Sequence, residues 1–156
     1  MPISLRDLDL RGTGSCASFN FRRTARAVTR FYDLALQDSG VRSTQFTILV
    51  GIAKTQPTPI TALGDLLVID PTTLTRSLKL LKKQGLVQIS ERSTMRQRFV
   101  SLAPKGEQAL AKALPLWRQA HTRFLEAIGP GYWTNLQQEL EGLARLTVNL
   151  EASAGS

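Results

Sequence analysis

Threonine, arginine and lysine side chains between positions 71 and 84 have the chemistry needed to bind a nucleic acid. Leu74, Leu78 and Leu81 are spaced by four and three residues, which predicts a helix with one buried face. On its other faces, threonine hydroxyls can bond phosphates or base edges, arginine can hold guanine through two hydrogen bonds, and lysine can neutralise phosphate. The candidate DNA contacts on this helix are Thr72, Thr73, Thr75, Arg76, Lys79, Lys82 and Lys83.

The net charge of the chain is concentrated in the same region. From Pro71 to Gly106 there are eight lysine or arginine residues and one acid, Glu91, a net charge of +7, whereas all 156 residues carry +8. Phosphate neutralisation with counterion release supplies most of the affinity of a protein for DNA, so double-stranded DNA is the expected partner. An acidic membrane surface, or a basic helix face that meets only solvent, are the alternatives from charge alone.

The residues before this helix predict a helix-turn-helix. Thr61 is expected to cap a short helix over Ala62–Val68 and to contact DNA itself. Asp70 directly before Pro71 is a typical start signal, with aspartate as the N-cap and proline at the first helical position. The second helix of the pair is therefore the one that carries the candidate DNA contacts.

A basic hairpin is predicted after Gly85. The runs Leu86–Ser90 and Arg98–Leu102 are strand-like, and the segment between them is polar and basic. Arginine is attracted to the negative potential of the minor groove, which a hairpin beside a recognition helix can reach. The candidate contacts here are Arg92, Arg96 and Arg98, the first two nearer the tip.

The rest of the chain is predicted to be helical. Apolar periodicity predicts helices over 17–37, from Ser43 or Thr44 as N-cap to Ala53, over 105–128 and, after a break at 129–131, over 132–150. The expected fold class is mainly α-helical with a small β-wing. We expect one domain over 1–156, with a winged-helix DNA-binding lobe at 43–106. Helices at 17–40 and 107–150 are expected to dimerise, because they need a partner for their apolar faces.

The composition leaves little room for catalysis, metal binding or secretion. Cys16 is the only cysteine and His121 the only histidine, so one chain can form no intramolecular disulfide and no cysteine- or histidine-rich zinc site. No carboxylate pair has a useful spacing, and we expect no enzyme activity, no catalytic residue, no metal and no cofactor. The first twelve residues lack the apolar run of a secretory signal and no run has the length of a membrane span, so we expect no membrane partner and a cytoplasmic location.

Several segments resemble the MarR family of bacterial winged-helix transcription regulators, and the likeness extends over about residues 17–150. The segments are Thr61–Leu67, Thr72–Arg76 and Leu81–Val87. Leu102–Gly106 is similar to the family's Leu-Thr-x-x-Gly, with Ala103 in place of threonine. The resemblance implies a winged helix-turn-helix repressor that binds a pseudo-palindromic operator as a homodimer.

The wing tip departs from the family pattern. The family has Asp-x-Arg there, where the aspartate orients the arginine, but this chain has Thr94-Met95-Arg96. Arg96 is therefore present without the carboxylate partner that the family pattern has at this place.

The resemblance further implies release from DNA by a small aromatic or anionic effector, bound in a crevice between the dimerisation helices and the lobe. Arg22, Arg26 and Arg30 repeat every four residues and could meet a carboxylate, although a solvated or salt-bridging face explains the same stripe. The residues expected to line the crevice are Phe19, Arg23, Tyr32, Phe46, Trp117 and His121.

Cys16 allows a second kind of signal, the oxidation of a thiol by a hydroperoxide. Hydroperoxide sensors of the family carry a reactive cysteine at the start of the first helix, and Cys16 lies near that position and near Arg22, which favours a thiolate. An inert thiol is the alternative. The sequence also allows an architectural DNA binder without an effector, and an adaptor for other proteins built on the same scaffold.

Overall fold

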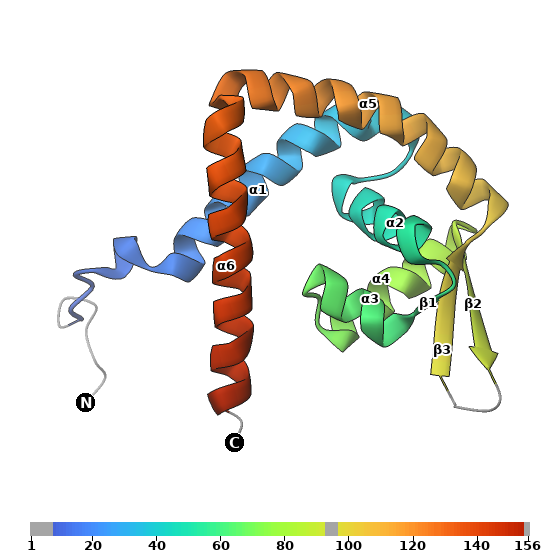
Figure 1. Cartoon of the computed structure of the whole chain (residues 1–156), viewed down its shortest axis with the longest axis horizontal. Helices are drawn as coiled ribbons and strands as arrows, with labels where there is room; N and C mark the ends of the chain where they lie inside the picture. Colours follow the sequence, from blue (N-terminus) through green and yellow to red (C-terminus); the bar gives the residue numbers. More distant parts are fainter. Residues whose placement is uncertain (1–7, 93–96, 155–156) are drawn as a thin grey trace.

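The computed structural model describes residues 8–92 and 97–154 and shows six α-helices with a small antiparallel sheet (Figure 1). This architecture confirms the predicted fold class, mainly α-helical with a β-wing. A 3-10 turn precedes the first long helix and another follows it. The helices are α1 (Ala17–Leu36), α2 (Ser43–Thr55), α3 (Ile60–Leu67), α4 (Pro71–Lys83), α5 (Pro104–Ile128) and α6 (Pro130–Ala154), and the strands are β1 (Thr58–Pro59), β2 (Val87–Arg92) and β3 (Gln97–Leu102).

The sheet has a strand that periodicity did not predict. Its order is β1-β3-β2, with β2 and β3 forming the expected hairpin in the register Val87↔Leu102 to Arg92↔Gln97. The added strand, β1, pairs Thr58 with Val100. Two residues are too few to show an alternating pattern, so only the tertiary pairing reveals this strand.

The hydrophobic core lies between α2, α3, α4 and the sheet, and the end of α1 and the first half of α5 also contribute to it. Leu49 and Ile52 of α2 and Leu63 of α3 are fully buried there. The predicted inner face of α4 is confirmed, because each of its three leucines is buried. Val100 closes the core from β3. A core of this kind holds α4 by one face and leaves its other faces free for a ligand.

Three predicted helix ends were wrong. The N-cap of α2 is Arg42 instead of Ser43 or Thr44, because the backbone N–H and the hydroxyl of Ser43 both donate to Asp33 Oδ1, at 2.7 and 2.8 Å. The short helix α3 starts at Ile60 and ends at Leu67, so Thr61 lies in its first turn and is not its cap. The break before α6 is Gly129 alone (φ 91°), because Pro130 fits the first turn of a helix.

Val68 occupies the tight turn between α3 and α4 in a left-handed conformation, with φ 51° and ψ 47°. It is the single non-glycine residue with positive φ among the residues described, and its side chain is 63% exposed. A β-branched side chain in this conformation crowds the backbone, at a cost of about 1–2 kcal/mol, and an exposed side chain recovers little of it by packing.

Val68→Gly should therefore stabilise the protein by about 1 kcal/mol, after allowing for the greater freedom of glycine in the unfolded chain. Thermal unfolding at a fixed protein concentration measures this gain. Val68→Ala keeps the Cβ and should give a smaller gain. An equal gain from both variants would show that the cost comes from the exposed side chain and not from the backbone.

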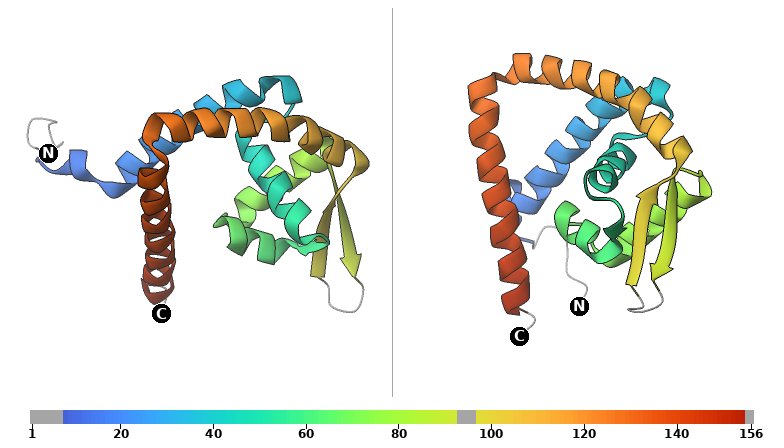
Figure 2. Two further views of the ribbon diagram at one scale, coloured as in Figure 1. Left: turned by 45° about the horizontal axis from the view of Figure 1, so that its top comes forward. Right: turned by 45° about the vertical axis from the view of Figure 1, so that its right-hand side comes forward.

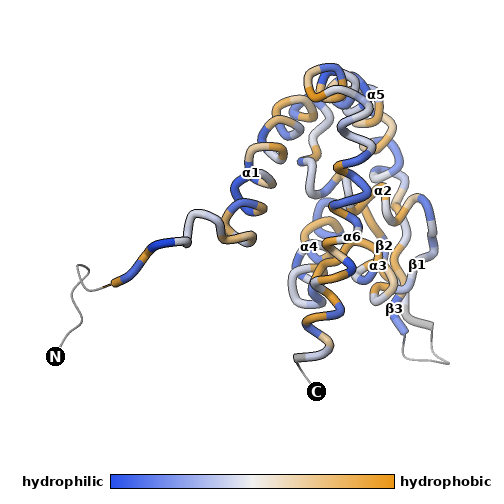
Figure 3. Tube along the Cα trace, turned by 60° about the vertical axis from the view of Figure 1, so that its left-hand side comes forward, coloured by the Kyte–Doolittle hydropathy of each residue, from blue (hydrophilic) through white to orange (hydrophobic). Residues whose placement is uncertain are grey.

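The two C-terminal helices carry the chain away from the wing. The helix α5 crosses over α1 and α2, and α6 then lies on the opposite side of the lobe from the wing (Figures 1 and 2). Within α5, Pro115 has no backbone N–H to donate to the carbonyl one turn earlier. Hydrophobic positions recur along α1 and α6 (Figure 3), and Leu140, Leu143 and Leu150 of α6 are exposed. No helix in the described part of the chain is long and apolar enough to cross a membrane.

Candidate nucleic-acid interface

The start of α4 is fixed as the sequence predicts. Asp70 is its N-cap and Pro71 its first residue, and Asp70 Oδ1 accepts a hydrogen bond of 2.9 Å from the backbone N–H of Thr73. Hydrogen bonds from the side chain and the backbone of Thr73 lower the pKa of Asp70 below its ordinary value. The capping carboxylate holds the first turn in one orientation, and this turn carries Thr72 and Thr73.

Because the pKa of Asp70 is lowered by folding, its cap stabilises the protein only while the side chain is ionised. The contribution is complete above the ordinary aspartate pKa of about 3.9, and it is lost as the pH falls through the lower pKa of the folded state. Asp70→Ala should lower the melting temperature at pH 7, and the difference from the unmodified protein should shrink below pH 4. Asp70→Asn keeps a capping acceptor that does not titrate, and it should stay close to the unmodified protein at pH 7. An Asn variant as unstable as the Ala variant would rule out capping as the reason.

The outward side of α4 divides into a centre and two flanks. Successive residues of a helix are about 100° apart, so Thr72, Arg76, Lys79 and Lys83 lie roughly opposite the three buried leucines. Thr75 and Lys82 lie on one flank, and Thr73 lies toward the other. All seven side chains are exposed, and among the described residues none of them forms an ion pair. The predicted DNA contacts on this helix therefore share one accessible basic surface, which we call the α4 face.

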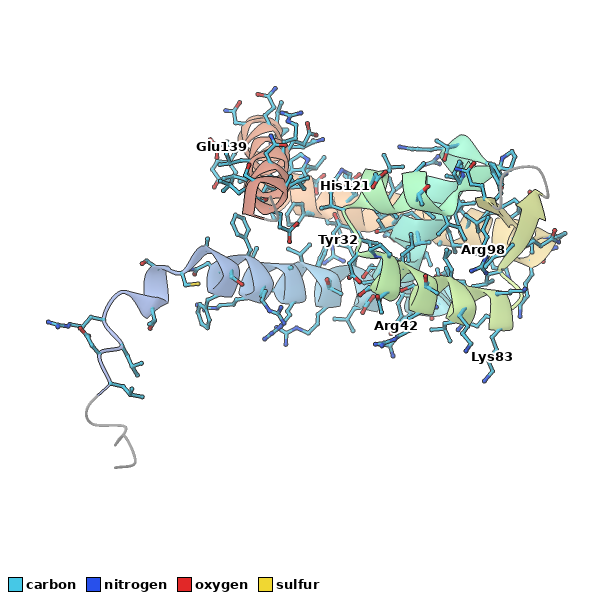
Figure 4. The ribbon with its side chains drawn as sticks, turned by 90° about the horizontal axis from the view of Figure 1, so that it is seen from below. Tyr32, Arg42, Lys83, Arg98, His121 and Glu139 are labelled. Carbon is cyan, nitrogen blue, oxygen red and sulfur yellow. The ribbon has the colours of Figure 1, made fainter. Side chains whose placement is uncertain are left out.

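The remaining predicted contacts belong to α3 and to the hairpin. Thr61 is exposed in the first turn of α3, two helices before the wing. Arg98 is exposed on β3 (Figure 4). In the strand register it pairs with Glu91 of β2, and Arg92 ends β2 opposite Gln97. Arg96 lies outside the described residues.

Arg42 is not among the contacts predicted from the sequence, but it extends the basic surface onto α2. Its side chain is exposed at the N-cap of α2 and extends toward the same side of the molecule as Lys83 (Figure 4). Gln45 Nε2 donates to Gln84 Oε1 at 2.9 Å, which ties the start of α2 to the end of α4. A cavity of about 310 Å³ lies at this junction, with Arg42 and Leu80 in its lining. Arg42 belongs to no periodic pattern, so only the packing of α2 on α4 reveals it.

A second candidate site is a cavity of about 330 Å³ between α1, α2 and α5. It brings together four of the six residues predicted for an effector crevice, namely Tyr32, Phe46, Trp117 and His121. Phe19 and Arg23 are exposed on the N-terminal half of α1 and do not line it. The remaining lining residues are Val28, Thr29, Leu36, Ser43, Thr44 and Thr47.

Aromatic rings and a hydrogen-bonded pair of side chains belong to the lining of this cavity. The indole ring of Trp117 stacks between His121, at a centroid distance of 4.9 Å, and Phe46, at 5.9 Å. Tyr32 Oη and His121 Nδ1 are joined by a hydrogen bond of 3.0 Å. Burial raises the pKa of the Tyr32 hydroxyl, so this group is a neutral donor or acceptor at pH 7. The cavity therefore offers flat apolar surface beside a polar pair.

The chain is similar to a protein family model and to transcriptional regulators of known structure. A MarR family model matches residues 41–94. The crystal structure of the M. tuberculosis transcriptional regulator MosR in complex with DNA is similar, with 31% sequence identity and a TM-score of 0.79, over 86% of this chain and 98% of that one. The protein belongs to the MarR family.

Two further solved structures agree with this family fold. A probable transcriptional regulator from Pseudomonas aeruginosa has 26% identity and a TM-score of 0.72, over 81% of this chain and 96% of that one. AbsC, a MarR family regulator from Streptomyces coelicolor, has 20% identity and a TM-score of 0.74, over 91% and 99% of the two chains, and supports the fold alone. A search of curated proteins found no match. The chain is thus a winged-helix transcription regulator of the MarR family.

In this MarR-family chain, Cys16 is exposed and immediately precedes α1. Asn20 Nδ2 donates to the Cys16 carbonyl oxygen at 3.0 Å, a contact that fixes the backbone and leaves the thiol free of it. A signal through the Cys16 thiol remains a prediction. The test measures how peroxide changes DNA binding by the Cys16→Ser variant. If the variant is as sensitive to peroxide as the unmodified protein, the prediction is wrong. In residues 8–92 and 97–154, no cluster of three or more His, Cys, Asp or Glu could hold a metal ion.

Proposed function

We propose that this MarR-family regulator represses transcription by binding a pseudo-palindromic operator as a homodimer. The observation that carries the proposal is the α4 face, an exposed row of threonine, arginine and lysine on a helix whose other side is locked into the core. The 31% identity to MosR, which has been crystallised with DNA, supports the same reading. A helix held in this way can enter the major groove without losing internal contacts.

The α4 face separates two kinds of DNA contact. Arg76 lies at its centre, one turn after the helix start, where its guanidinium can reach the edge of a guanine. The lysines Lys79, Lys82 and Lys83 follow toward the C-terminal end, and we assign them to phosphates. Thr61 and the wing arginines would fix the position of the lobe on the neighbouring backbone and in the minor groove. Base reading therefore rests mainly on the first two turns of α4.

Dimerisation is proposed for the helices over 17–40 and 107–150. The N-terminal half of α1, with Phe21, is exposed in the single chain. Four leucines of α6 are exposed as well, Leu140, Leu143, Leu146 and Leu150. A two-fold partner would bury these apolar side chains and place two lobes symmetrically on DNA. Sedimentation equilibrium of the full chain should give twice its mass of 17.2 kDa, and a monomer at micromolar concentration would refute the dimer.

The direct test is fluorescence anisotropy with labelled duplex from the region upstream of the protein's own gene. An unrelated duplex of equal length is the control, and both are measured across a salt series. We expect tighter binding to the upstream duplex at every salt concentration, and a steep negative slope of log affinity against log salt. Equal binding to both duplexes would favour an architectural role, and no binding at low salt would refute DNA binding.

The cavity between α1, α2 and α5 supports a second proposal, that a small molecule binds there and regulates DNA binding. Its stacked rings fit a flat aromatic molecule, and the Tyr32–His121 pair can meet a polar or anionic group. We propose that a small aromatic carboxylate binds there and weakens DNA binding. Benzoate is a simple probe: it should quench the fluorescence of Trp117, and Tyr32→Phe should weaken that binding. Quenching that is equal in both proteins would place the ligand elsewhere.

A further inference from the structure

Leu80 is an exposed leucine on a helix side that is otherwise polar. Half of its side chain is accessible (50%), although the core positions of α4 are already filled by leucines before and after it in the sequence. The neighbouring outward positions carry threonine, arginine and lysine. Packing within the described chain therefore gives only a partial reason for an apolar side chain at this position.

Leu80 lies close to Arg76, the residue that we propose to read a base. It follows Arg76 by four residues, so it lies about 6 Å further along the helix and about 40° around it, toward the start of α2. It lines the cavity of about 310 Å³ together with Arg42, Ser77 and Gln84. Arg42 is exposed at this edge and can bind a phosphate. The α4 face is therefore continued by one apolar contact point followed by one cation.

We propose that Leu80 contacts the 5-methyl group of a thymine in the major groove and so determines which base stands there. The thymine methyl is the apolar feature of the major-groove edge of the base pairs, and apolar side chains recognise it by contact. Arg42 would hold the adjacent phosphate and carry no sequence information. The inference rests on the proposed DNA binding of α4 and adds a specificity-determining residue to it.

The test replaces thymine by deoxyuracil, which lacks only this methyl group. Duplexes bound by the full chain are first selected from a random pool, and each conserved thymine is then replaced singly. At one position in each half-site, the replacement should weaken binding about fourfold, or about 0.8 kcal/mol, the value of one buried methyl group. Leu80→Ala should weaken binding to the thymine duplex by a similar factor or more, and it should abolish the difference between thymine and deoxyuracil at that position alone.

Arg42→Gln is the matched control on the same flank. It should weaken binding to every duplex by one common factor and keep the preference for thymine. Leu80 is half exposed, so Leu80→Ala should fold, and a melting temperature within a few degrees of the unmodified protein confirms this. Specific binding with no deoxyuracil effect, or with an effect that persists in Leu80→Ala, overturns the inference and leaves the proposed function intact. Failure to select any preferred duplex overturns both.

Discussion

Gly106→Ala should destabilise the protein by about 3 kcal/mol, at the upper end of the range for overpacked sites. Gly106 lies buried in the first turn of α5, where the chain leaves the wing. A Cβ there would overlap the backbone carbonyl oxygen of Leu86, and the Leu86 carbonyl carbon would be 2.9 Å away. The obstacle is backbone, and the same oxygen accepts a hydrogen bond of 3.0 Å from Ala103. Neither side can move without opening the junction between α5 and the hairpin.

Denaturant unfolding at a fixed protein concentration measures this effect. Gly131→Ala is the matched control, because a Cβ at Gly131 in the first turn of α6 meets no atom within 4 Å. The control should change the free energy of unfolding by less than about 0.5 kcal/mol. A loss for Gly106→Ala that is no greater than for Gly131→Ala would contradict the close approach of α5 to the start of β2.

Arg76→Ala should weaken binding to the operator by about 1–3 kcal/mol, or roughly five- to 150-fold, if its guanidinium holds a guanine. Arg76 lies opposite the buried leucines, so its removal should leave the core unchanged. The loss should be much smaller on an unrelated duplex, because the guanine contact is absent there. Anisotropy titrations with both duplexes give the ratio directly.

Lys82→Ala on the flank of α4 serves as the comparison. Its charge should act on phosphates in any sequence, so binding to both duplexes should fall by the same factor, and the salt slope should fall by about one unit. If Arg76→Ala also reduced both affinities equally, Arg76 would be a phosphate contact, and the assignment of base reading would pass to the threonines of the first turn.

The sequence alone predicted most of the lobe because its signals are local. Asp70 followed by Pro71 marks the start of α4, and the spacing of Leu74, Leu78 and Leu81 marks its inner face; the structure confirms both. The end of α2 and the pair of strands in the wing follow from similar short patterns. Such features depend on residues within one or two turns of each other.

The features that the sequence did not predict depend on contacts between distant residues. Asp33 on α1 moves the start of α2 by binding Ser43, ten positions later. The strand β1 exists only through its pairing with Val100, and Arg42 joins the basic surface only because α2 packs against α4 through Gln45 and Gln84. Four of the six residues expected for an effector crevice line one cavity, but Phe19 and Arg23 lie elsewhere, because a family resemblance gives a region and not its lining.

Pro115 makes α5 easier to bend at one point along its length. A helix of 25 residues is a stiff rod roughly 37 Å long, and Pro115 removes one of its internal hydrogen bonds. Before Pro115, Leu110 and Ala113 are buried in the lobe, and just beyond it Trp117 packs against the same core and, with His121, lines the aromatic cavity. Bending at this joint costs less than bending elsewhere along the rod. In the proposed dimer, bending at Pro115 would change the gap between the two recognition helices, and the regulator would then tolerate different half-site spacings that its rigid core does not allow.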